Sequence, residues 1–168
     1  MLVTVNESHY DVGAIKQRLQ NFKETSRDLE MQLDRLQMYI ESIESPGSPT
    51  ISDMPKSPSP DVDKFTVKIA KKIDLENCIR STVAVLEDEK SYFETVLSHI
   101  RKADEKAVIR FRYFDSLNWN KIAEIMFGSN SLYDEKQDTY LRRVHKLHGS
   151  ALLNMAIYIE DCMSYENR

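Results

Sequence analysis

Helix-breaking residues are scarce in this sequence of 168 residues and are gathered in one place. Only four glycines occur, and all five prolines lie in the short stretch from Pro46 to Pro60. Proline and glycine are the residues that most often interrupt a helix. We therefore expect long helices on either side of a single break, and little backbone suited to a tight catalytic loop.

Sequence motifs of enzymes and metal sites are also lacking. The chain contains no glycine-rich phosphate loop, no GxSxG and no HExxH. Cys78 and Cys162 are far apart and form no CxxC pair, and His145 and His148 have no evident third ligand. The sequence thus predicts a protein that is not an enzyme and that holds no cofactor and no metal.

Charge and hydropathy indicate neither a strongly basic protein nor a membrane protein. The formal net charge is −4, and 41% of the residues are hydrophobic. A strongly basic balance would indicate nucleic acid, although local patches matter more than the total. The sequence shows no signal peptide and no apolar run long enough to cross a bilayer. We therefore expect a cytoplasmic protein with no membrane partner.

A hydrophobic stripe runs along the first quarter of the chain. Its positions are spaced alternately by three and four residues, and only Ser26 among them is polar. This heptad pattern predicts one long coiled-coil helix, from about Ser8 to Glu44, within an N-terminal segment 1–44. The stripe has to be buried against a partner. It comprises Val12, Ile15, Leu19, Phe22, Ser26, Leu29, Leu33, Leu36, Ile40 and Ile43.

A second long helix is expected after a loop. Residues 45–60 are rich in proline and serine, which predicts a loop, and helical spacing resumes over a segment 61–102. An antiparallel hairpin is the simplest way to bury both stripes. A homodimeric coiled coil would bury the same stripe, and the sequence does not choose between them. The candidate partner or oligomer surface is formed by Val12, Ile15, Leu19, Phe22, Leu29, Leu33 and Leu36.

Shorter helices are expected in a region 103–161, before a C-terminal tail at 162–168. Gly128 is expected to stop the middle helix of this region. The patterns predict helices at Ala103–Phe114, at Asn118–Phe127 with Asn118 as N-cap, and from about Leu132 to Asp161 with Ser131 as N-cap.

This order of elements is typical of a helix-turn-helix unit. A short helix, a turn containing glycine and a longer second helix form such a unit, and the second helix lies in the major groove of DNA. Trp119, Ile122 and Met126 would fill the core between the helices. The fold class predicted is therefore all-α, a long antiparallel helical hairpin followed by a helix-turn-helix-like unit.

Basic residues are close together in the last predicted helix. Arginine can read guanine edges or bind phosphates, so Arg142, Arg143 and Lys146 are candidate DNA contacts. A solvated helix face is the alternative interpretation. Arg110 and Arg112 are expected to pair with nearby acids, and His148 is expected to be a packing residue.

The same region resembles a known family. The signature RY…W..IA..M of phage-encoded regulators related to sigma-70 region 4, of the ArpU/RinA type, is similar to RFRYFDSLNWNKIAEIM at 110–126. The helix that follows in that family resembles RRVHKLHGSALLNM at 142–155. Proteins of this type from prophages of Gram-positive bacteria are also similar at 52–56, SDMPK, and 69–79, IAKKIDLENCI. The resemblance therefore covers nearly the whole chain.

The resemblance implies a transcriptional regulator that binds promoter DNA in the cytoplasm of a bacterial host cell. We also expect a homodimer, and the hairpin would serve dimerisation or contact with RNA polymerase. The expected contacts to bases or phosphates are Arg142, Arg143, His145 and Lys146, and those to the DNA backbone are Asn120 and Lys121.

One feature departs from the family pattern. Between Met126 and Val144 the chain is about ten residues longer than a helix-turn-helix with a short turn requires. The extra segment is acidic, with Asp134, Glu135 and Asp138. If it begins the last helix, its acids oppose docking to phosphates, whereas if it forms a loop the helix from Arg142 onward stays available. The second hypothesis is thus a protein-interaction module that binds a regulator, polymerase or another protein and no DNA.

Overall fold

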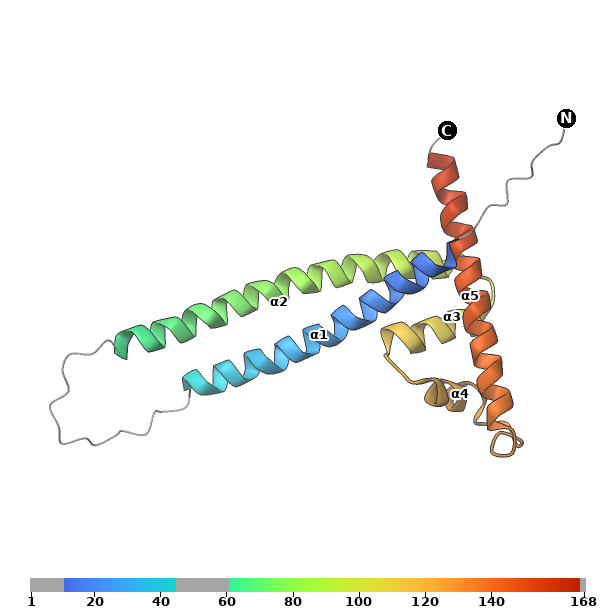
Figure 1. Cartoon of the computed structure of the whole chain (residues 1–168), viewed down its shortest axis with the longest axis horizontal. Coiled ribbons are helices and arrows are strands. Elements are labelled where there is room, and N and C mark those ends of the chain that lie inside the picture. The colour runs from blue at the N-terminus through green and yellow to red at the C-terminus, as the bar shows by residue number, and fades with distance from the viewer. Residues whose placement is uncertain (1–10, 45–60, 167–168) are drawn as a thin grey trace. The chain divides into compact units, whose positions relative to one another are not determined.

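The computed structural model describes residues 11–44 and 61–166, and in these ranges every regular element is a helix (Figure 1). The all-α prediction is confirmed for this part of the chain. The predicted loop at 45–60 and the expected helix start near Ser8 lie outside the described residues. The elements are α1 (Val12–Glu44), α2 (Asp61–Ser98), α3 (Ala103–Ile109), the π-helix η1 (Arg110–Phe114), α4 (Trp119–Phe127) and α5 (Gln137–Glu166).

The helices begin and end where their capping groups allow. Asp11 caps α1, because its Oδ1 accepts a hydrogen bond from the backbone N–H of Ala14 at 2.8 Å. α2 ends at Ser98 rather than at residue 102, since the N–H groups of His99 and Ile100 donate to carbonyls three residues back, at 3.2 and 3.1 Å. The predicted cap of α4 is confirmed, because Asn118 Oδ1 accepts from the N–H of Lys121 at 2.8 Å.

The last helix differs from its predicted bounds at both ends. It begins at Gln137 and not near Leu132, because residues 128–135 form turns. The backbone N–H of Leu132 donates to Oδ1 of Asn130 at 3.1 Å, so Asn130 takes the capping role that was predicted for Ser131. The helix also continues to Glu166 instead of ending at Asp161, since neither proline nor glycine follows there.

The predicted helix 103–114 changes its winding in the last turn. The N–H of Asp115 donates to the carbonyl of Arg110 at 3.0 Å, which is the wider spacing of a π-helix. Ser116 then adopts a left-handed conformation with φ of 55°, and the N–H of Leu117 returns to Phe111 at 2.9 Å. The chain turns within these few residues and enters α4.

The chain divides into two compact units, and each is described by itself. Unit 1 combines residues 1–24 with 89–168, and unit 2 comprises residues 25–88. In unit 1 the start of α1 packs on the end of α2, and the ring of Phe22 contacts those of Phe93 and Phe114 edge-on at 6.0 and 5.3 Å. Its core is fully buried at Leu19, Phe93, Leu97, Ile109, Ile122, Val144 and Met155.

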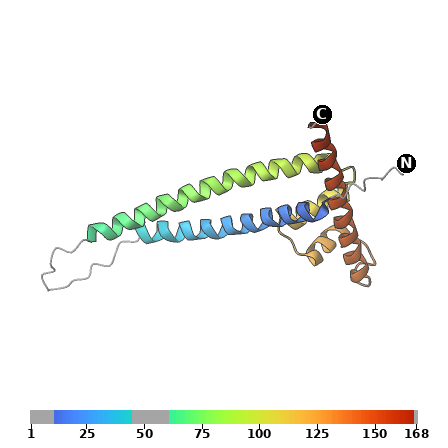
Figure 2. The same ribbon diagram turned by 45° about the horizontal axis from the view of Figure 1, so that its top comes forward.

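Unit 2 consists of two helical segments, residues 25–44 of α1 and residues 61–88 of α2, which lie alongside each other (Figures 1 and 2). Arg35 and Tyr39 of the first and Leu75 of the second line one shallow pocket. Among the described side chains of this unit, Ile79 is the one buried hydrophobic residue. Leu33, on the predicted stripe, is 46% exposed. The pairing of the two segments therefore covers the stripe only in part.

In unit 1, α4 and α5 share a small core below α3. Val108, Ile122, Ala123 and Val144 are buried there, and Trp119 and Met126 pack against them. Ala123 is 2% exposed, as expected where two helices approach closely. Gly128 ends α4 with ordinary right-handed angles, and a Cβ at this position would lie 2.4 Å from the carbonyl oxygen of Glu124. Glycine is needed there for space and not for a left-handed turn. No described helix is both long enough and apolar enough to span a membrane.

Candidate nucleic-acid interface

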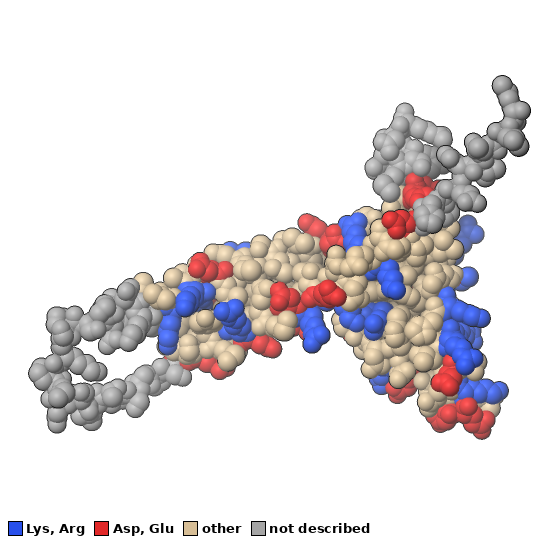
Figure 3. Space-filling view, viewed as in Figure 1, with Lys and Arg blue, Asp and Glu red and all other residues tan. Residues whose placement is uncertain are grey.

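The predicted basic residues of α5 lie on its solvent side. Val144, Ala151 and Met155 face the core and are at most 3% exposed, whereas Arg142, Arg143 and Lys146 are exposed. This division follows from helical spacing, because residues 142 and 146 lie about half a turn away from Val144 and Met155. Figure 3 shows lysine and arginine side chains gathered along the α5 side of unit 1, with acidic side chains near the start of the helix.

Arg143 is positioned by aromatic side chains. Its guanidinium carbon lies 4.8 Å from the centroid of the Phe127 ring at the end of α4. Phe127 stacks on Tyr140 at 5.3 Å, and Tyr140 contacts Tyr133 of the preceding turn at 5.5 Å. These rings connect the acidic turn to the first turns of α5 and hold Arg143 over the junction with α4.

His145 lies against a tryptophan at the other edge of the helix. Its ring centroid is 4.6 Å from that of Trp119, and the Arg112 guanidinium lies 4.5 Å from the same indole. Arg112 also donates from Nη1 to the carbonyl of Leu117 at 3.0 Å. Arg112 therefore stabilises the turn before α4. It is held by Leu117 and Trp119, and not by the acid that the sequence analysis expected. His145 belongs to this aromatic cluster more than to the basic face.

His148 is a packing residue, as expected. It is 8% exposed, and its Nε2 lies 3.0 Å from the hydroxyl of Tyr113. Burial, followed by the nearby positive charges of Lys16, His145 and Arg112, lowers the pKa of His148 to about 4. Burial also raises the pKa of the Tyr113 hydroxyl. Both groups are therefore neutral at pH 7, and His148 adds no charge to the basic face.

The two candidate contacts on α4 lie in a different setting. Asn120 and Lys121 are exposed and line a groove with Glu124, Asp134 and Gln137. Lys121 Nζ forms an ion pair with Glu124 at 3.0 Å. The groove is thus mixed in charge, and it does not include Arg142, Arg143, His145 or Lys146. Of the six predicted contacts, Asn120 and Lys121 are therefore the two that line this groove.

The acidic segment forms turns over most of its length and enters α5 at its end. Asp134 and Glu135 precede the helix, and only Asp138 lies in its first turn. The structure lies between the two arrangements that the sequence left open, because residues 131–135 form turns whereas residues 137–139, with Asp138, begin the helix. The predicted DNA contacts of α5 begin five residues after its start.

A buried carboxylate in unit 1 was missed by the sequence prediction. Glu105 of α3 is fully buried and accepts hydrogen bonds from Ser150 and Asn154 of α5, both at 2.7 Å, and from Lys102 at 3.0 Å. Burial alone raises the pKa of this carboxyl, but the three hydrogen bonds outweigh it and hold the pKa below its ordinary value. Spacing could have revealed it, because Glu105 precedes Val108 and Ile109 by three and four residues on one apolar face.

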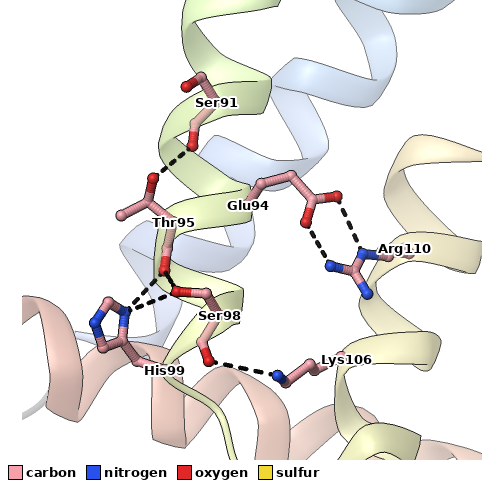
Figure 4. Close-up of polar contacts among 7 residues, drawn as sticks. All are labelled: Ser91, Glu94, Thr95, Ser98, His99, Lys106 and Arg110. Atoms are coloured by element: carbon pink, nitrogen blue, oxygen red, sulfur yellow. Dashed lines mark hydrogen bonds and ion pairs between the residues drawn. The ribbon is translucent and has the colours of Figure 1, made fainter.

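Polar contacts also connect α2 with α3 and η1 (Figure 4). Arg110 pairs through two nitrogens with the carboxylate of Glu94, which confirms the expected pairing of Arg110 with an acid. This hydrogen-bonded guanidinium holds the pKa of Glu94 below its ordinary value. Lys106 Nζ reaches the carbonyl of Ser98 at 3.4 Å, and His99 Nδ1 lies 2.9 Å from the carbonyl of Thr95. The contacts of Lys106 and Arg110 join the end of α2 to α3 and η1, and Glu105 belongs to α3.

The predicted partner surface on α1 is divided between the two units. In unit 1, Ile15, Leu19 and Phe22 are at most 9% exposed, so the chain itself buries them and they are not available to a partner. Val12 is half-buried. In unit 2, Leu29 and Leu36 are half-buried and Leu33 is exposed. Only this second part of the predicted surface remains accessible.

Within residues 11–44 and 61–166, no group of three or more His, Cys, Asp or Glu side chains is arranged to hold a metal ion. Comparisons with protein-family models, curated proteins and solved structures give no match for this chain.

Proposed function

We propose that the chain is a DNA-binding transcriptional regulator in which α4, the turn and α5 form a helix-turn-helix-like unit. Its sequence resembles phage-encoded regulators related to sigma-70 region 4. The packing of α4 on α5 through Ile122, Ala123 and Val144 supports this arrangement, because a short helix braced against a longer one is the form of such a unit. In this proposal α5 lies in the major groove of promoter DNA. The protein acts in the cytoplasm of a bacterial host.

The observation that carries the proposal is the exposed basic face of α5. Arg142, Arg143 and Lys146 lie opposite the core side of the helix. The acids Asp134 and Glu135 are outside the helix, and Asp138 in its first turn is the one acid of this segment that lies on α5. Arginine side chains at such positions form two hydrogen bonds to guanine or bind phosphate.

The test is binding of the purified protein to duplex DNA across a salt series. Affinity should fall steeply with salt, because phosphate binding releases counterions. The variant R142Q/R143Q should bind at least about tenfold more weakly, and its log–log salt slope should be shallower by about 2. Both arginines are exposed, so its circular dichroism and melting temperature should stay close to wild type.

The matched control removes the same amount of charge elsewhere. Lys71 and Arg80 are exposed residues of unit 2, and K71Q/R80Q should leave DNA affinity nearly unchanged. Equal losses in both double variants would mean that binding follows net charge and not the face of α5. Full binding by R142Q/R143Q would reject the assignment of the DNA contacts.

A second candidate function is a protein-interaction module that binds no DNA. The groove lined by Lys121, Glu124 and Asp134 favours it, since its acids would repel phosphate and attract a basic peptide segment. RNA polymerase or another regulator would be the partner, and the net charge of −4 agrees with this. A pull-down with purified RNA polymerase, compared between wild type and E124Q/D134N, distinguishes this function from DNA binding.

A further inference from the structure

A guanidinium and an imidazole lie against the same indole in unit 1. The guanidinium carbon of Arg112 is 4.5 Å from the centroid of the Trp119 ring, and the ring of His145 is 4.6 Å from it. Trp119 is itself held, because the buried ring of His148 contacts it edge-on at 5.0 Å. The indole is thus a platform that keeps Arg112 and His145 in place before any ligand binds.

Arg112 is a half-buried cation that no acid neutralises. Arg110, two residues earlier, pairs with Glu94. The ion pairs among the described residues include none with Arg112, and its Nη1 donates to the uncharged carbonyl of Leu117. Burying part of a charge without a counter-charge costs free energy. A cation held in this way is typical of a site that binds an anion.

Lys16 of α1 adds a second unpaired cation nearby. It is exposed, and none of the ion pairs within residues 11–44 and 61–166 involves it. The charged groups that shift the pKa of the buried His148 ring are Lys16, His145 and Arg112, all of them basic. Because charges act strongly only over short distances, Lys16 lies close to the same ring. Positive charge therefore gathers here from α1, η1 and α5.

This group of side chains adjoins the basic face of α5. We call Lys16, Arg112, Trp119 and His145 the indole cluster. His145 follows Arg142 by three residues, and residues three apart are neighbours on the surface of a helix. When a helix occupies the major groove, the sugar-phosphate strands run along its edges. The indole cluster is thus placed beside the surface that is proposed to meet DNA.

We propose that the indole cluster binds one phosphate of the DNA backbone. Arg112 supplies the planar fork of its guanidinium, His145 a ring N–H and Lys16 its ammonium group. Contacts of this kind carry no sequence information, but they fix the protein on the duplex. The indole cluster would therefore set the register in which Arg142 and Arg143 meet the bases. This inference rests on the proposed function and deepens it, because it gives the start of α1 a part in binding.

The first test uses inorganic pyrophosphate and no DNA. Trp119 is the single tryptophan, so its fluorescence reports directly on the indole cluster. Pyrophosphate added to the full chain at low ionic strength should change this fluorescence in a saturable way, whereas sodium chloride at the same ionic strength should not. K16Q and R112Q should each bind pyrophosphate about tenfold more weakly, because each loses a charge-assisted hydrogen bond.

Matched variants separate the indole cluster from net charge and from folding. K90Q removes an exposed charge from α2 in the same unit and should leave the pyrophosphate affinity unchanged. R112K keeps the charge but not the planar fork, so its affinity should lie between those of wild type and R112Q. Arg112 also holds the Leu117 carbonyl, so melting temperatures are compared for all variants. Lys16 is exposed, and K16Q keeps the test valid if R112Q does not fold.

The second test places the phosphate on duplex DNA. K16Q should weaken binding about equally for every sequence, and its log–log salt slope should be shallower by about 1 than that of wild type. K90Q should keep the wild-type slope. A shallower slope in K16Q alone would assign the backbone contact to Lys16 and, through it, to the indole cluster.

The outcomes distinguish failure of this inference from failure of the proposed function. A fluorescence change that chloride reproduces, or that K16Q and R112Q leave intact, would overturn the inference whatever the duplex measurement gives. Binding of pyrophosphate by a wild type that binds no duplex would reject the proposed function and DNA as the source of the phosphate. Duplex binding with an unchanged salt slope in K16Q would keep the proposed function and remove the indole cluster from the interface.

Discussion

Units 1 and 2 use the same stripe of α1 in different ways. Ile15, Leu19 and Phe22 are at most 9% exposed in unit 1. Leu33, which lies two heptads after Leu19, is 46% exposed in unit 2. The spacing of the stripe is unchanged between them. In unit 1 the ring of Phe22 packs on Phe93 of α2 and Phe114 of η1, in a unit that also contains α3, α4 and α5, whereas α2 is the one other helix among the described residues of unit 2. Burial is decided by how many elements surround a stripe, and not by its regularity.

Polar groups differ between the units in the same way. Unit 1 buries the carboxylate of Glu105 and supplies it with three hydrogen-bond donors. The pair Lys72–Glu76 in unit 2, at 3.1 Å, is partly exposed on one helix. The one buried side-chain polar atom without a partner among the described residues, Gln32 Oε1, also belongs to unit 2. A thin two-helix unit cannot surround a buried polar group as the larger unit does.

The largest expected contrast is between two leucines of one stripe. Leu19→Ala should lower the free energy of unfolding by about 2–5 kcal/mol, because it leaves a cavity in the fully packed core of unit 1. Leu33→Ala should change it by less than about 1 kcal/mol, since that residue is already 46% exposed to water. Urea unfolding followed by circular dichroism measures both. Equal effects would show that the two parts of the stripe are packed alike.

The next contrast is between two carboxylates. Glu105→Ala should cost about 3 kcal/mol, because Ser150 and Asn154 lose their acceptor inside the protein. Glu76→Ala should cost no more than about 0.5 kcal/mol, as is usual for an exposed pair one helical turn apart. The same unfolding experiment applies. If Glu105→Ala left the free energy of unfolding nearly unchanged, water would have to replace the carboxylate at this position.

The sequence predicted where the helices lie better than which of their residues are buried. Period and caps placed α1, α3 and α4 to within a few residues, because these signals are local. The start of α5 was missed because Ser131 and Asp134 imitate a capping box, while the backbone closes turns around Asn130 instead. The local sequence could not predict that Leu19 would be buried and Leu33 exposed. It depends on which later helices return to α1.

The candidate site shows the same limit. Exposure of Arg142 and Lys146 could be predicted, because helical spacing alone puts them nearly opposite Val144. The groove that Asn120 and Lys121 line with Glu124 and Asp134 could not be predicted, since it depends on how the turn at 128–136 folds against α4. The hydrogen bonds of Glu105 join α3 to α5 across more than forty residues of sequence. Only its place on an apolar face was visible beforehand.

The buried polar groups of unit 1 should make the protein sensitive to acid. The folded pKa of His148 is about 4, below the ordinary 6.5, so its contribution to stability is complete above pH 6.5 and is lost as the pH falls toward 4. The loss is on the order of 3 kcal/mol. Glu105, whose folded pKa is also lowered, adds a further loss at still lower pH.

Urea unfolding at a series of pH values, followed by the fluorescence of Trp119, measures this loss where it occurs. Trp119 is the single tryptophan, and its ring lies 5.0 Å from that of His148. His148→Gln should flatten the dependence between pH 6.5 and 4 while leaving the acid limb below it. A ring-proton titration by nuclear magnetic resonance is the independent check. An ordinary pKa for His148 there would remove the basis of the prediction.

The smallest expected effect concerns a position of unit 1 that lies outside its core. Gly149 is exposed inside α5, and a Cβ there would meet nothing within 4 Å. Gly149→Ala should therefore raise the free energy of unfolding by about 0.5–1 kcal/mol, because alanine restricts the unfolded chain and favours the helix. Gly128→Ala is the matched control and should be destabilising, since its Cβ would lie 2.4 Å from the carbonyl oxygen of Glu124. A loss of stability in Gly149→Ala would indicate that this face of α5 is covered in solution, which would also hide Arg142 and Lys146 from DNA.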